Sequence, residues 1–145
     1  MTRVPDDIPT TLTEVKLCEI AAVKRTRRRE WANKNQVRKA AARGRYGERD
    51  ALETAAFRFL VAELGYEDAT VIWTDLRPVL AKSMPEDRLL AVINTQLKTG
   101  RLLADPREIG GHVLGGHPFR VIELTTAIDE VRTAYRRLSN AKQRR

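Results

Sequence analysis

Basic side chains are the residues whose type and spacing point to chemistry in this chain. Five of the six positions from Lys24 to Arg29 are Lys or Arg, and residues 1–46 hold twelve cations against five acids. Adjacent cations repel one another, so folding alone gives no reason to gather them, although such a run can also be a merely solvated surface. Clusters of Lys and Arg bind polyanions by releasing condensed counterions. The predicted nucleic-acid contacts in this region are Lys24, Arg25, Arg27, Arg28, Arg29, Lys34, Arg38, Lys39, Arg43 and Arg45.

The charge is segregated along the sequence. Residues 132–145 add six cations and no acid, whereas residues 47–131 hold nine cations against fourteen acids. A mildly acidic body therefore lies between two basic ends, within a total net charge of +8. This pattern predicts a nucleic acid as partner and leaves open a homodimer or a protein partner on the acidic body.

Patterns typical of catalysis or metal binding are weak in comparison. Cys18, the sole cysteine, falls on an apolar stripe, where it is expected to be a small core residue. His112 and His117 stand five positions apart with only Glu108 nearby, which is too few ligands for a metal site. We therefore predict a protein that is not an enzyme and uses no metal and no cofactor, with a nuclease of scattered carboxylates as the alternative.

The elements that would position these side chains follow from the apolar periodicity. Residues 1–46 combine an apolar stripe that ends near Val23 with a weak apolar set around Trp31, which predicts a basic helical arm without a core. Residues 128–145 predict an amphipathic helix with a basic tail. The expected fold class is mainly α with a small β-hairpin. The body, 47–127, predicts helices over 48–64, 74–83 and 84–99 and short strands over 102–103, 109–114 and 119–124.

This order of helices and hairpin resembles the winged helix-turn-helix superfamily over residues 48–124. The stretch Leu97-Lys98-Thr99-Gly100-Arg101-Leu102-Leu103 looks like the helix-glycine-strand entry into a wing. The resemblance implies a winged-helix core whose third helix, 84–99, lies in the major groove, which favours DNA over RNA. If Leu90, Ile93 and Leu97 face the core, the residues expected to contact DNA from this helix and the wing are Arg88, Thr95, Lys98, Arg107 and Arg120.

The same region also supports a plainer interpretation. Glu86 and Asp87 begin the predicted third helix and would repel the phosphates that a reading helix approaches. An ordinary solvated helix of a small fold is therefore the alternative for residues 86–99.

The function predicted from these features is nucleic-acid binding, by a DNA-binding regulator or an architectural accessory factor. The alternative is a protein docking module, or a structural subunit of a nucleoprotein or viral assembly, anchored to RNA or DNA by its basic arm. No apolar run reaches the ~20 residues of a membrane span. A single cysteine and an N-terminus without a secretory pattern predict a cytoplasmic protein, associated with the nucleoid if it binds DNA.

Overall fold

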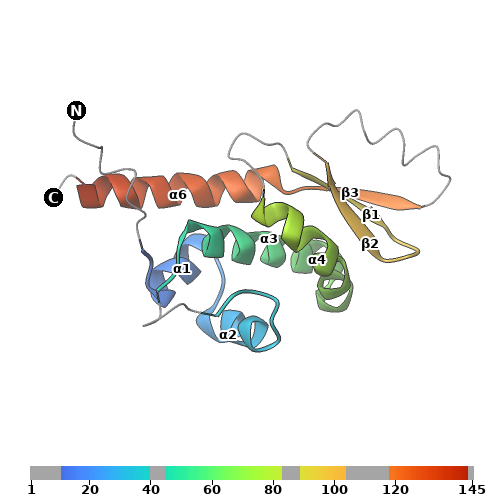
Figure 1. Cartoon of the computed structure of the whole chain (residues 1–145), viewed down its shortest axis with the longest axis horizontal. Helices are drawn as coiled ribbons and strands as arrows, with labels where there is room; N and C mark the ends of the chain where they lie inside the picture. Colours follow the sequence, from blue (N-terminus) through green and yellow to red (C-terminus); the bar gives the residue numbers. More distant parts are fainter. Residues whose placement is uncertain (1–10, 40–44, 83–88, 104–117, 144–145) are drawn as a thin grey trace. The chain divides into compact units, whose positions relative to one another are not determined.

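The structure is a computed structural model that describes residues 11–39, 45–82, 89–103 and 118–143 (Figure 1). It is mainly helical, as the sequence predicted, and a small three-stranded antiparallel sheet takes the place of the predicted β-hairpin. The chain forms two compact units: unit 1 comprises residues 1–55 and 128–145, and unit 2 comprises residues 56–127. No helix among the described residues is long and apolar enough to span a membrane.

Unit 1 begins with two short helices joined by a three-residue turn. Helix α1 (Glu14–Ala21) starts at Thr13, whose hydroxyl oxygen accepts a hydrogen bond from the backbone N–H of Lys16 at 3.3 Å. It ends at Ala22, which adopts the left-handed conformation at φ 57° and lets the chain reverse. Helix α2 (Arg25–Asn33) follows at once and packs against α1 (Figure 1, blue).

The region predicted to be an arm without a core has buried side chains of its own. Leu12 and Tyr46 form an isolated antiparallel bridge, with N–O distances of 2.7 and 2.9 Å, that brings the two ends of residues 12–46 together. Apolar side chains from α1, α2, α3 (Glu48–Leu64), α6 (Thr125–Gln143) and the segment after α2 are also buried in this unit. They include Leu17, Cys18, Trp31, Val37, Ala51, Leu52, Ile128, Val131 and Tyr135.

Unit 2 contains the second part of α3, helix α4 (Tyr66–Ala81) and strands β1 (Leu90–Asn94), β2 (Thr99–Leu103) and β3 (Phe119–Glu123). The strand order is β2-β1-β3, and both pairings are antiparallel. The Phe57 ring of α3 lies 5.4 Å from the ring of Trp73 on α4, centroid to centroid. The predictions of a helix over 48–64, a strand over 119–124 and a C-terminal amphipathic helix are confirmed.

The predicted third helix over 84–99 is wrong within the residues that the structure describes. Leu90–Asn94 form β1, residues 95–98 form a turn, and Thr99 begins β2. Leu89 to Ile93 are continuously buried, as expected of a central strand covered on both faces. The spacing of Leu90, Ile93 and Leu97 fits a helix as well, so the pattern did not separate the two structures. Residues 83–88 lie outside the described part of the chain.

Two further predictions in unit 2 need correction or lie outside the structure. Helix α4 begins at Tyr66 rather than at residue 74, and Ile72 and Trp73 are buried residues of this helix. Pro78 falls inside this helix. The strand predicted over 109–114 lies outside the described residues, and so do His112 and His117.

Helix α4 lies close to the sheet at a glycine. A Cβ atom on Gly100 would stand 2.7 Å from Cγ2 of Ile72 and 3.2 Å from Cδ2 of Leu76. The backbone N–H of Gly100 donates to Oδ2 of Asp75 on the same helix at 3.0 Å. Residue 100 is therefore restricted to glycine by the approach of β2 to α4, and not by the end of a helix.

Candidate nucleic-acid interface

The first turn of α2 presents exposed cations. Arg28, Trp31 and Ala32 are buried at three- and four-residue spacing, which fixes the face of α2 that points inward. Lys24, Arg25 and Arg27 are exposed, and in the part of the chain that the structure describes none of them forms an ion pair. These three predicted contacts are thus available to a phosphate.

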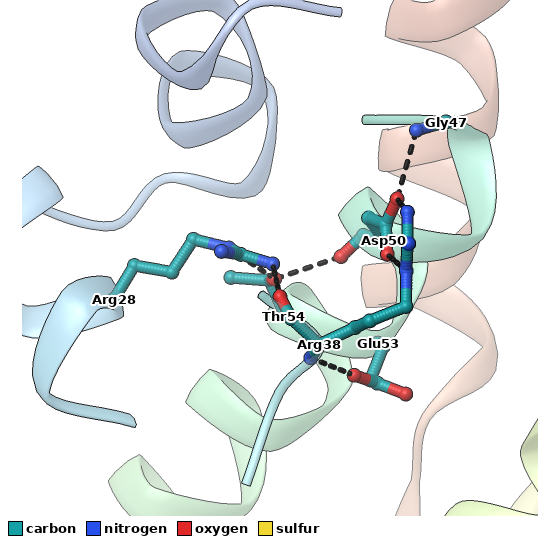
Figure 2. A network of polar contacts seen from close by, with 6 residues as sticks. All are labelled: Arg28, Arg38, Gly47, Asp50, Glu53 and Thr54. Carbon is teal, nitrogen blue, oxygen red and sulfur yellow. Dashed lines mark hydrogen bonds and ion pairs between the residues drawn. The ribbon is translucent and has the colours of Figure 1, made fainter. Parts of the chain in front are cut away.

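Arg28 lies in the interior, although the sequence marked it as a nucleic-acid contact. Only 2% of its surface is exposed, its Nε donates to Oγ1 of Thr54 at 3.0 Å, and its Nη2 donates to the carbonyl oxygen of Arg38 at 2.9 Å (Figure 2). Its Cζ stands 4.6 Å from the ring centroid of Tyr46. The guanidinium therefore joins α2, the chain around Arg38 and α3, and it is not placed to bind a phosphate.

Arg38 is held by an acid on α3. Its Nε and Nη2 donate to the two carboxylate oxygens of Asp50 at 2.8 and 2.7 Å, in the bidentate geometry that suits arginine (Figure 2). These hydrogen bonds raise the pKa of the Arg38 guanidinium. Asp50 also accepts the backbone N–H of Gly47 at 2.8 Å, and Glu53 accepts the backbone N–H of Arg38 at 2.9 Å. The pair fixes the start of α3 to the segment that follows α2.

Arg29 links the two short helices. Its Nε and Nη2 donate to the carboxylate of Glu14 at 3.0 and 2.6 Å. This contact lowers the pKa of Glu14 and raises that of Arg29. The Arg29 side chain of this pair is exposed, so part of its guanidinium still faces solvent.

The remaining predicted contacts of unit 1 are distributed around it. Lys34, Lys39 and Arg45 are exposed, and Arg43 lies outside the described residues. From α6, Arg136 and Arg137 are exposed as well, whereas Arg132 is buried. In sequence, unit 1 holds 19 cations against 10 acids, whereas unit 2 holds 8 against 9. The excess positive charge of the chain therefore belongs to unit 1.

The predicted contacts of unit 2 do not share a reading helix. Thr95 lies in the turn between β1 and β2, and Lys98 pairs with Asp68 at 3.0 Å, which raises the lysine pKa. Arg120 on β3 donates to the carbonyl oxygen and the carboxylate of Glu63. Arg88 and Arg107 lie outside the described residues. The described members of this set are therefore separated on strands and turns, and two of them already bind acids.

The sequence interpretation missed three residues on the outer face of α2. At about 100° per residue, Thr26, Glu30 and Asn33 lie opposite the buried Arg28, Trp31 and Ala32, and all three are exposed. The turn before α2 contains Ala22, Val23 and Lys24, without the glycine that often marks such turns. The spacing of Trp31 and Ala32 after Arg28 could have indicated the inward-facing side of α2. An arginine was not expected on that side.

Two features of the described residues bear on catalysis and on metal binding. Cys18 is buried as predicted, and its burial raises the pKa of the thiol, which disfavours the nucleophilic thiolate. In the described ranges no group of three His, Cys, Asp or Glu side chains is placed to hold a metal ion.

Comparison with known proteins gives no family for the chain. No protein-family model matches the sequence, and no curated protein is similar to it.

Proposed function

We propose that unit 1 binds duplex DNA through a helix-turn-helix formed by α1 and α2. The observation that carries this proposal is the pair of short helices, Glu14–Ala21 and Arg25–Asn33, joined by a three-residue turn, with exposed cations at the start of the second helix. In helix-turn-helix proteins the second helix enters the major groove and its N-terminal residues contact the bases. The proposed reading helix is therefore α2 and not residues 84–99.

The contacts within unit 1 support this assignment. A reading helix must be held rigidly while its outer face stays open. Arg28 and Arg29 fasten α2 through Thr54 and Glu14, on sides of the helix other than its outer face. The cations at its start, Lys24, Arg25 and Arg27, would then neutralise backbone phosphates beside the groove.

A duplex of DNA fits this geometry better than one of RNA. The major groove of B-DNA is about 12 Å wide and admits an α-helix. The major groove of A-form RNA is deep and narrow, and side chains cannot read it. A single exposed helix with polar groups on its outer face is thus suited to DNA. The proposed role is that of a regulator or an architectural accessory factor, and the winged-helix relationship of residues 48–124 stays a prediction.

A salt titration of DNA binding tests this proposal. The full chain is compared with R25A/R27A and with K82A/R101A, which removes the same charge from exposed positions of unit 2. Affinity for a labelled random duplex is measured by fluorescence anisotropy at increasing salt. Each phosphate contact contributes about 0.9 to the slope of log K against log salt, so R25A/R27A should lower the slope by about 2.

The control variant decides between a site and a diffuse charge effect. K82A/R101A should leave the slope unchanged, because unit 2 makes no contact with DNA in this proposal. Equal effects of the two double variants would show that net charge alone drives binding. Such a result, or a wild-type chain that does not bind duplex DNA, contradicts the proposal.

A further inference from the structure

One acidic side chain lies on the otherwise basic exposed surface of α2. Glu30 is exposed, with Thr26 one turn before it and Asn33 almost one turn after it on the outer face. At about 1.5 Å per residue these three positions span about 10 Å, close to three base-pair steps of about 3.4 Å. The outer face of α2 is therefore long enough to contact a few successive base pairs.

The environment of Glu30 differs from that of the other acids near α2. Glu14 binds Arg29, and Asp50 binds Arg38. In the described part of the chain, the Glu30 carboxylate makes no ion pair, although Arg27 and Lys34 stand three and four positions away. A carboxylate among phosphate-binding cations weakens binding to any polyanion. Neither an ion pair among the described residues nor a contribution to general DNA affinity therefore explains an acid at this position.

The chemistry of the major groove suggests a use for an ionised carboxylate. It can only accept hydrogen bonds, so it needs a base edge that donates. Cytosine presents its N4 amino group as a donor, whereas adenine places the N7 acceptor beside its N6 donor. The adenine N7 would repel a carboxylate, and guanine and thymine present acceptors. Cytosine is therefore the best partner for Glu30.

We infer that Glu30 is a specificity-determining residue that accepts a hydrogen bond from the N4 amino group of a cytosine in the major groove. The inference rests on the proposed function, because it requires α2 to lie in that groove. Glu30 lowers the general attraction for DNA and in return selects one base pair. Its removal is expected to strengthen binding to random duplexes while weakening the choice of sequence.

Selection from random duplexes tests this inference with the full chain. The wild type, E30Q and E130Q are each enriched on the same pool, with a pool of structured RNA in parallel. E130Q removes one exposed acid from α6 and serves as the matched control. The wild type should select a short site with a cytosine at one position. E30Q should reduce the preference for that cytosine by up to about 5- to 150-fold, the factor by which one mismatched base pair typically weakens a site.

The outcomes separate this inference from the proposed function. E130Q should select the same site as the wild type. An unchanged preference in E30Q overturns the inference, and so does a wild type that binds duplexes without selecting a sequence or that selects RNA instead. In the case of binding without selection, the slope measured for R25A/R27A still supports or contradicts DNA binding by α2, so the two failures remain distinguishable.

Discussion

The two units of this protein use their charged side chains differently. In unit 1 the cations outnumber the acids, Arg28 is buried, Arg38 is paired with Asp50, and Lys24, Arg25 and Arg27 remain exposed without an ion pair among the described residues. In unit 2 the charges are nearly balanced, and Lys98 and Arg120 bind Asp68 and Glu63 across neighbouring elements. This difference shows that a cation in a basic run is available to a ligand only where folding has not already given it a partner.

The largest effect is expected from the buried arginine of unit 1. R28M removes two hydrogen bonds and leaves Thr54 and the Arg38 carbonyl without their donor, so the free energy of unfolding should fall by about 3 kcal/mol. R27M, at the neighbouring exposed residue, is the control and should change the free energy of unfolding by less than about 0.5 kcal/mol. Urea unfolding measures both. Equal changes would remove the distinction between internal and exposed cations in unit 1.

The packing of unit 2 provides the next effect. G100A places a Cβ atom 2.7 Å from Ile72 and should lower the free energy of unfolding by about 1–3 kcal/mol. I72A removes the methyl group that this Cβ atom would contact. The loss of free energy of unfolding in the double variant G100A/I72A should therefore be smaller than the sum of the losses in the two single variants. Thermal unfolding of the three variants measures this coupling. Strict additivity would mean that α4 and β2 do not restrict residue 100.

The acids of the two units can be compared directly. Asp50 is 6% exposed and holds Arg38 in a bidentate pair, whereas Asp68 is 43% exposed in its pair with Lys98. D50N should lower the free energy of unfolding by about 1–2 kcal/mol, because a buried hydrogen-bonded charge is replaced. D68N should have no measurable effect, since solvent screens exposed pairs. Chemical unfolding of both variants checks this order, and the reverse order would contradict the contrast between the units.

The smallest effect concerns the link between α1 and α2. Because the folded state lowers the pKa of Glu14, its stabilisation is complete above the ordinary glutamate pKa and is lost as the pH falls through the lowered value. The stability difference between the wild type and E14Q should therefore be present at neutral pH and disappear in acid. Unfolding midpoints at several pH values measure it. A difference that persists in strong acid would mean that the Glu14 carboxylate does not stabilise α1 and α2 through its charge.

The fold could be predicted from the sequence only where a local pattern is typical of a single type of element. Helix α3 was predicted because its apolar residues recur at helical spacing up to Gly65. Strand β1 was not, because a short apolar run from Leu89 to Ile93 suits a strand or a helix. The left-handed residues Ala22 and Asn35 give no local signal as strong as glycine.

The candidate site depended on contacts that are distant in sequence. The basic run between Lys24 and Arg29 was recognised, but the burial of Arg28 depends on Thr54, which is 26 residues away. The pairing of Lys98 with Asp68 likewise joins a turn to a separate helix. Local charge patterns can therefore locate a basic segment, but they do not separate its structural arginines from those left for a ligand.

The chain order of the two units has a consequence for synthesis. Unit 2 is continuous, whereas unit 1 draws Ile128, Val131 and Tyr135 from α6, which the ribosome makes after residues 56–127. Domains generally fold as units while the chain emerges. Unit 2 can therefore fold on the nascent chain while the core of unit 1 still lacks these side chains. A chain whose translation stops before α6 would carry α1 and α2 in an incomplete unit, so the proposed DNA-binding unit is completed only when α6 has been synthesised.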